Sequence, residues 1–165
     1  MMSPVDIVIL LKIICYGNEV WKQSTLADSL GISQSEVSKS LKRSKYAGLL
    51  DPSGKNIMKS ALFEFLQYGF RYTFPIKPGP IVRGVPTSHS AKPLSELIES
   101  TEAYVWPYGK GSVRGHSIIP LYPSAPEAAL KDEKLHELLA LTDALRVGRT
   151  RERNMAIEEL NKRIF

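Results

Sequence analysis

The sequence predicts a mainly α (α+β) protein with helices at both ends of the chain. Two observations predict this class. Apolar residues recur at three- and four-residue steps within residues 1–70 and 127–165, as they do in packed helices. Nine of the eleven prolines fall between residues 75 and 126, which excludes long regular structure there. We therefore expect a helical domain over residues 1–70, a Pro-rich α+β excursion over 71–126 and a C-terminal helical pair over 127–165.

The first helix is expected to begin at Pro4, with Ser3 as its N-cap, and to run through the apolar stretch to Cys15. Asp6 and Lys12 interrupt this stretch, no basic segment precedes it, and it is shorter than the roughly 20 residues of a membrane span. We therefore expect no membrane partner and, by default, a cytoplasmic location. The lone Cys15 is predicted to be a small buried hydrophobe.

Two further helices are predicted before residue 47. Val20 to Gln23 is either a short strand or an extended lead-in, after which Ser24 is expected to cap a helix that ends at Gly31. Ser33 and Glu36 form a capping-box pattern that opens the next helix, which runs to about Tyr46.

Leu49 to Ile57 resembles a very short hairpin around the turn residues 51–54, and a helix is predicted over 59–69. In the Pro-rich excursion, short strands are expected at 70–74 and 103–106. The second strand is followed by a Gly-Lys-Gly turn and Val113, which could close a hairpin. The aromatic and branched residues of the excursion are too numerous for a flexible linker. Helices return from Ala125, with leucines at helical spacing before Gly148 and a last helix after it.

Residues 24–46 carry the packing pattern of a helix-turn-helix. Such a motif needs a small residue in its first helix, a glycine able to adopt positive φ in the turn, and an apolar residue inside its second helix; here these are Ala27, Gly31 and Val37. The other positions that pack the two helices are also apolar: Leu26, Leu30, Ile32 and Leu41.

Thr25 to Arg43 resembles the DNA-binding motif of bacterial winged-helix transcriptional regulators of the MarR-like kind, and Gly48-Leu49-Leu50 resembles the step into their wing. The resemblance covers about residues 5–60. It implies a winged helix-turn-helix with a shortened wing, because only about six residues separate Leu50 from Ile57. It also implies a symmetric dimer, for which the leucine-rich helix over 133–147 is the candidate interface.

In that geometry the second helix enters the major groove, so its outward residues contact bases and the flanking basic residues contact phosphates. Lysine and glutamine can pair with guanine and adenine edges, and serine is short enough to admit the groove floor. The candidate DNA-contacting residues are Thr25, Ser33, Gln34, Ser35, Ser38, Lys39, Lys42, Arg43, Lys45 and Lys55. Taken alone, Lys39, Lys42, Arg43 and Lys45 would more often be a solvated helix face. They are interpreted as a DNA face because they share a helix with the buried pattern of a recognition helix.

Charge gives the same indication more weakly. The chain carries a net charge of +5, and residues 1–60, with eight basic and five acidic side chains, hold most of the excess. If two copies each neutralise about four phosphates, log K should fall against log salt with a slope of roughly −7. The two recognition helices of such a dimer should lie about 34 Å apart on a near-palindromic site.

Other motifs are interpreted structurally. The Gly-rich stretch 109–115 lacks the spacing of a phosphate-binding loop and is predicted to be a hairpin turn. His89, His116 and His136 are too widely spaced to form a metal site with a single cysteine, so neither a metal nor a cofactor is expected. Thr87 to Ser90 lacks the sequence context of a hydrolase nucleophile, and no enzyme activity is predicted.

The arginines around Gly148 allow three interpretations: a helix-end charge cluster, a second nucleic-acid contact, or a docking surface for an acidic partner. The predicted function is sequence-specific double-stranded DNA binding in transcription regulation, with repression favoured because occlusion requires nothing beyond binding. The alternative is an antitoxin-like or adaptor module whose region 72–122 binds a partner protein. A third interpretation, a ligand-responsive regulator, needs a concave pocket near the Pro-rich segment.

Overall fold

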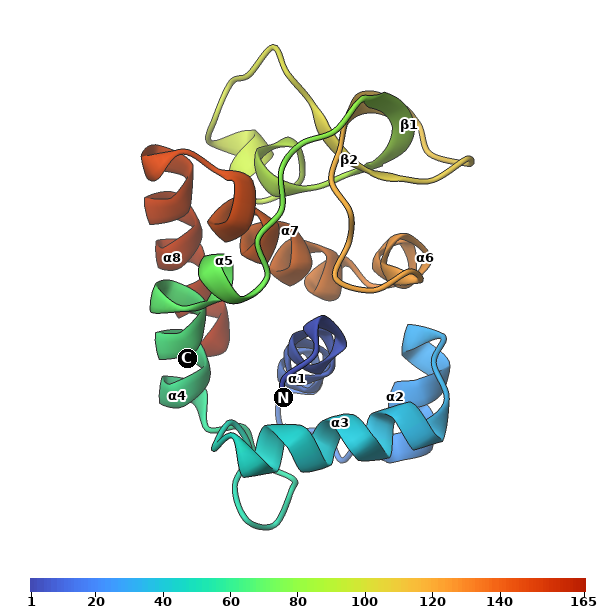
Figure 1. The fold of residues 1–165 in the computed structure, drawn as a ribbon, viewed down its shortest axis with the longest axis vertical. Helices are drawn as coiled ribbons and strands as arrows, with labels where there is room; N and C mark the ends of the chain where they lie inside the picture. The colour runs from blue at the N-terminus through green and yellow to red at the C-terminus, as the bar shows by residue number, and fades with distance from the viewer.

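The computed structural model describes residues 1–165 and has a mixed α+β fold (Figure 1). The elements follow in the order α1 (Pro4–Tyr16), α2 (Gln23–Leu30), α3 (Gln34–Tyr46), α4 (Lys59–Tyr68), α5 (Phe70–Thr73), β1 (Ile81–Pro86), η1 (Ser88–Ser90), η2 (Leu94–Glu96), β2 (Tyr104–Pro107), β3 (Val113–Ser117), α6 (Ala125–Lys131), α7 (Glu133–Val147) and α8 (Thr150–Ile164). None of the helices combines the length and the apolar character that crossing a bilayer requires.

The first 46 residues fold largely as predicted. α1 begins at Pro4 after Ser3, and its side chains from Asp6 to Leu11 are all buried. Gly31 adopts the left-handed conformation, with φ 69° and ψ 36°, and the Ser33 hydroxyl accepts the Glu36 N–H at the start of α3. Only the capping of α2 was predicted wrongly: its N-cap is Lys22 and not Ser24, so the helix begins two residues earlier and Ser24 lies in its first turn. Residues 20–22 are extended but form no strand.

Residues 49–58 form the short hairpin that the sequence predicts. A single β-bridge joins Leu50 to Ile57, and backbone hydrogen bonds from Asp51 to Asn56 and from Met58 to Leu49 flank it. The loop projects from the underside of α3 (Figure 1). α4 follows at Lys59, as predicted.

The strand predicted over 70–74 is wrong, because this segment forms the short helix α5. Its aromatic residues suggest a strand by type, but their spacing suits a helix: Phe70 and Phe74, four residues apart, meet edge to face, and Phe65 of α4 contacts both. Phe70 is fully buried, so the aromatic cluster holds α4 and α5 together.

The predicted hairpin between residues 103 and 113 is also wrong. β2 and β3 pair in parallel, with Tyr104 opposite His116, and each pairs antiparallel with β1, which the sequence analysis did not identify. The three strands thus close into a small barrel, with β1 strongly curved (Figure 1). Gly84 lies opposite both Pro107 and Val113, at the point where the chain passes from β2 to β3. Such close approach requires glycine, because a Cβ at Gly84 would lie 1.9 Å from the Trp106 carbonyl oxygen.

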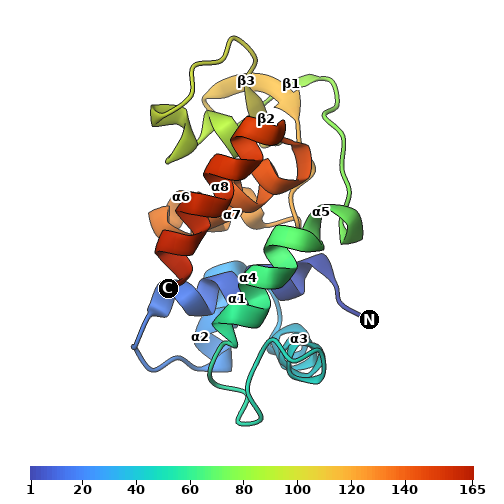
Figure 2. The same ribbon diagram turned by 90° about the vertical axis from the view of Figure 1, so that its left-hand side faces the viewer.

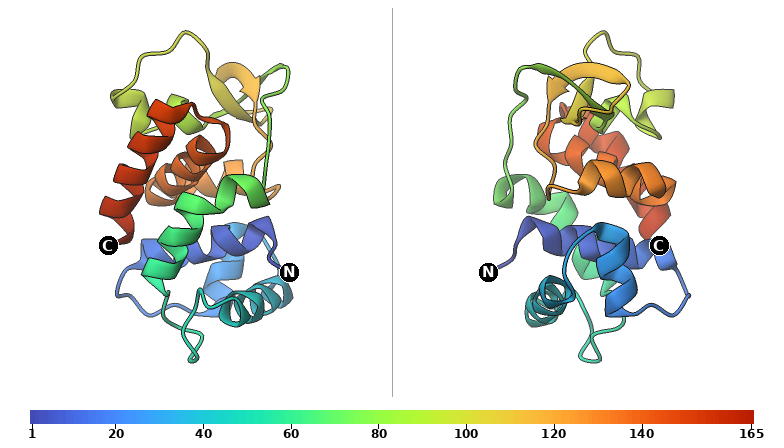
Figure 3. Two further views of the ribbon diagram at one scale, coloured as in Figure 1. Left: turned by 60° about the vertical axis from the view of Figure 1, so that its left-hand side comes forward. Right: turned by 90° about the vertical axis from the view of Figure 1, so that its right-hand side faces the viewer.

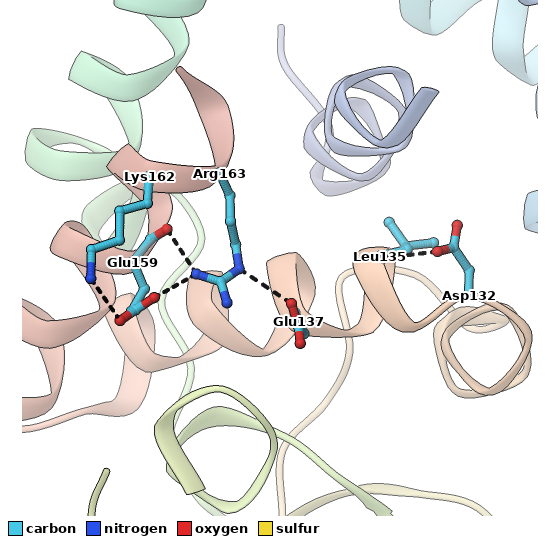
Figure 4. A network of polar contacts seen from close by, with 6 residues as sticks. All are labelled: Asp132, Leu135, Glu137, Glu159, Lys162 and Arg163. Atoms are coloured by element: carbon cyan, nitrogen blue, oxygen red, sulfur yellow. Dashed lines mark hydrogen bonds and ion pairs between the residues drawn. The ribbon is translucent and has the colours of Figure 1, made fainter. Parts of the chain in front are cut away.

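The C-terminal pair α7 and α8 is present as predicted, preceded by the shorter α6. α8 lies along α7 and α4 (Figure 2). Arg163 of α8 reaches Glu137 of α7 at 3.2 Å and Glu159 at 2.5 Å (Figure 4). The leucines of α7, which the sequence suggested as a dimer interface, are at most 3% exposed and pack inside the monomer.

A buried carboxylate attaches the small barrel to α7. Asp143 accepts hydrogen bonds from the Thr87 hydroxyl at 2.7 Å, the Trp106 indole N–H at 2.7 Å and the Arg146 guanidinium at 3.0 Å. Burial raises the pKa of Asp143, and these donors act against that shift. Arg146 also donates to the carbonyls of Phe74 and Ile119, so it fixes both ends of the Pro-rich segment between these residues against α7.

An ion pair links the N-terminal helices to α7. Lys12 of α1 contacts the Asp132 carboxylate at 2.5 Å, and Asp132 also caps α7 by accepting the Leu135 N–H (Figure 4). Burial alone raises the carboxyl pKa, but Lys12 and the backbone N–H outweigh it and hold the pKa of Asp132 below its ordinary value. The three segments distinguished in the sequence share one hydrophobic cluster. Figure 3 shows the N-terminal helices lying against the C-terminal ones.

Replacement of Asp132 by Asn should make stability less pH-dependent. Asn is an equally good helix cap, so the change removes mainly the charge. Because the folded-state pKa is lowered, the carboxylate stabilises the fold above the unfolded pKa of about 4, and this contribution is lost as the pH falls through the folded-state pKa. We expect Asp132→Asn to lower the free energy of unfolding by about 1 kcal/mol near pH 7 and by less below about pH 4. Urea denaturation of both proteins near pH 7 and below about pH 4 tests this prediction. An equal difference in the free energy of unfolding at the two pH values would contradict it.

Substitution of Gly84 should disrupt the barrel. A Cβ there would lie 1.9 Å from the Trp106 carbonyl oxygen and 3.0 Å from the Val105 Cβ, so Gly84→Ala should cost at least about 3 kcal/mol of stability or prevent folding. Gly109→Ala is the matched control, since a Cβ at Gly109 meets nothing within 4 Å, and it should change stability by less than about 0.5 kcal/mol. Similar unfolding midpoints for both variants would contradict the requirement for glycine at position 84.

Candidate nucleic-acid interface

The outward face of α3 is polar and positively charged. Val37, Ser40, Leu41 and Ser44 are buried against the other helices, which leaves the opposite side of α3 to solvent. At about 100° per residue, Ser35, Ser38, Lys39, Lys42 and Tyr46 fall on that side. Gln34, Glu36 and Lys45 are also exposed and lie toward its edges. None of the three lysines forms an ion pair.

A pocket of about 230 Å³ joins this face to the short hairpin and to the start of α2. From α3 it is lined by Ser38, Leu41, Lys42 and Lys45, and from the hairpin by Ser53, Gly54 and Lys55. No acidic residue lines it. The structure therefore brings together four of the residues predicted from sequence, Ser38, Lys42, Lys45 and Lys55, in a concave, positively charged site of the size of a phosphate group and its sugar.

Trp21 and Gln23 complete the lining of this pocket, and the sequence analysis did not include them. The Lys55 ammonium lies 5.5 Å from the centre of the half-buried Trp21 ring. Gln23 is exposed in the first turn of α2. The signal that could have identified Trp21 is a large aromatic side chain directly before a helix start, beside an otherwise polar segment.

The hairpin that carries Lys55 is held by its own polar contacts. The Asp51 carboxylate accepts hydrogen bonds from the Ser53 hydroxyl, the Asn56 side chain and the backbone N–H groups of Lys55 and Asn56. These bonds, led by those of Ser53 and Asn56, hold the pKa of Asp51 well below its ordinary value. Lys55 is therefore presented from a fixed turn although the hairpin has only one β-bridge.

Arg43 does not lie with the other basic residues. Its guanidinium makes two hydrogen bonds to the Asp6 carboxylate of α1, Nε to Oδ2 at 2.9 Å and Nη2 to Oδ1 at 2.7 Å. The Asp6 side chain is fully buried, and the hydrogen bonds that Arg43 donates to it raise the pKa of Arg43. This pair sets α3 against α1, so Arg43 positions the helix rather than extending its free positive face.

The remaining predicted residues are exposed but not joined to the pocket. Thr25 lies in the first turn of α2, and Ser33 caps α3 with its hydroxyl engaged by the Glu36 N–H. Gln34, Ser35 and Lys39 lie on the first turns of α3, beyond the pocket. The site thus has two parts: an exposed N-terminal half of α3, and a basic pocket beside its C-terminal half.

Comparisons of the chain with protein-family models, with curated proteins and with solved structures found no match.

The Asp6–Arg43 pair gives a stability prediction. Arg43→Ala leaves a buried carboxylate without its partner, which costs about 3 kcal/mol. Lys39→Ala removes the same charge from an exposed position with no partner, and should change stability by less than about 0.5 kcal/mol. Thermal and urea unfolding of the two variants provide the measurement. Equal stability of the two would show that Arg43 does not hold α3 in place.

Proposed function

We propose that this protein binds double-stranded DNA sequence-specifically through α3 and acts as a transcriptional regulator of the winged helix-turn-helix type. The observation that carries the proposal is the set of lysines on one face of α3 and on the adjoining hairpin, unpaired with acids, on a helix whose back is fixed by a buried core. If the lysines were merely a solvated helix face, α2, α3 and the hairpin would not have to line one basic pocket together.

The two parts of the site suggest a division of labour. The exposed stretch from Ser35 to Lys45 spans about 15 Å, or roughly four base pairs of a major groove. Gln34, Ser35, Ser38 and Lys39 would contact base edges, while Lys42, Lys45 and Lys55 would hold the phosphate backbone in the pocket, with the Trp21 ring against a deoxyribose. The stunted hairpin is too short for extended reading of the minor groove.

Occlusion of a promoter would make the protein a repressor. A symmetric dimer remains part of the proposal, because two half-sites read by two α3 helices raise specificity. Its interface would have to lie outside the buried leucines of α7.

Selection from a random double-stranded DNA library with the purified full chain tests sequence-specific binding. The proposal predicts an enriched motif and affinity that falls steeply with salt. Absence of any enriched motif would overturn it.

Charge removal tests the site itself. Lys42→Ala plus Lys45→Ala should reduce the slope of log K against log salt by about 1.8 per subunit and weaken binding similarly on all sequences. Lys110→Ala plus Arg114→Ala is the matched control: it also removes two exposed positive charges, but from the barrel end. Lys39→Ala should instead alter the preferred sequence. Equal losses in the two double variants would mean that only net charge matters.

A further inference from the structure

A groove of about 900 Å³ lies between the segment that leads into β2 and the junction between α7 and α8. Figure 1 shows these two segments at the opposite end of the molecule from α3. One wall is the segment of residues 98–104 that leads into β2, and the other is the junction between α7 and α8 at residues 147–152. A volume of this size is ample for a small-molecule or short-peptide ligand. The proposed DNA face does not use this groove.

The two walls carry opposite charges that do not meet. Glu99 and Glu102 lie on the first wall, and Arg149 and Arg151 on the second; all four are exposed, and the half-buried Glu152 also lines the second wall. None of them belongs to any of the seven ion pairs of the structure, so no carboxylate oxygen lies within 4.0 Å of a guanidinium nitrogen across the groove. Such facing charges can be satisfied by a ligand that carries both signs.

The arginine wall also contains the start of α8, a helix of 15 residues. Glu152 accepts the N–H of Arg149, but the backbone N–H groups of Thr150, Arg151 and Glu152 have no acceptor within the protein. The helix dipole favours a negative charge at this position, and the Glu152 carboxylate, which also lines the groove, supplies one.

A buried histidine lines the groove. His89 is 6% exposed, and its Nε2 donates to the Glu102 carbonyl at 2.6 Å, since a carbonyl oxygen can only accept. Its Nδ1 has no partner. The ring meets Tyr104 edge to face at 4.7 Å, so His89 fixes both the acidic wall and the aromatic lining.

We propose that this groove binds a short peptide with free ends, its carboxylate at Arg149 and Arg151, and its ammonium group at Glu99 and Glu102. The charges argue against other ligands: the carboxylates repel nucleotides and other purely anionic molecules, and the arginines repel polyamines. The volume exceeds what a single amino acid would fill. The proposal does not depend on DNA binding, because none of these residues lies in the α3 site.

The experiment uses the full chain and a pool of random-sequence tripeptides with free ends. Retained peptides are quantified by mass spectrometry after equilibrium ultrafiltration, beside pools of the same sequences that are acetylated, amidated or both. We expect retention of the free-end pool, at least a tenfold loss with either single cap, and no retention of the doubly capped pool. Equal retention of free and doubly capped pools, or no retention of any pool at millimolar concentration, would overturn the proposal.

Two double variants, each of which neutralises the charges of one wall, test which wall binds which end of the peptide. Arg149→Gln plus Arg151→Gln should abolish the discrimination against amidated peptides, and Glu99→Gln plus Glu102→Gln the discrimination against acetylated ones. Lys110→Gln plus Arg114→Gln, at exposed positions outside the groove, is the control and should leave both unchanged. Unfolding midpoints check that each variant is folded. Unaltered discrimination in both wall variants would contradict the assignment.

Discussion

The buried carboxylate of Asp143 is the contact on which the barrel end of the molecule depends. It lies on α7 and receives donors from Thr87, Trp106 and Arg146, which come from the turn after β1, from β2 and from α7 itself. A buried carboxylate without such partners costs several kcal/mol, so the three donors are effectively required together. Through them a segment with nine prolines and little regular structure follows a single path over α7.

Much of the helical part was predictable from the sequence, because its signals are local. Pro4, Gly31 and Ser33 mark helix starts and turns that each depend on a few neighbouring residues, and all three do so in the structure. The barrel was not predictable in the same way. β2 and β3 pair in parallel only because both pair with β1, and the pairing of β1 depends on the close approach at Gly84, which no local pattern encodes.

The candidate site was predicted in part for a related reason. Helical periodicity places Lys39, Lys42 and Lys45 outward, as the structure has them. It places Arg43 at the edge of the same surface, where sequence alone cannot distinguish a free cation from one held by Asp6, 37 residues away. Trp21 was missed because its role depends on the hairpin folding back to it. Whether a residue belongs to the candidate site or holds its helices in place is therefore decided by its long-range partners and not by its residue type.

α1 has no face left for solvent. From Asp6 to Leu11 every side chain is buried, with α2 and α3 on one side and α7, tied by Lys12 and Asp132, on the other. A fragment ending near residue 70 would expose the α7-facing half of this helix to water. The part that carries α3 is therefore not a detachable module: it acquires its shape only when the C-terminal helices close over α1, so the two ends of the protein should fold and unfold as one cooperative unit.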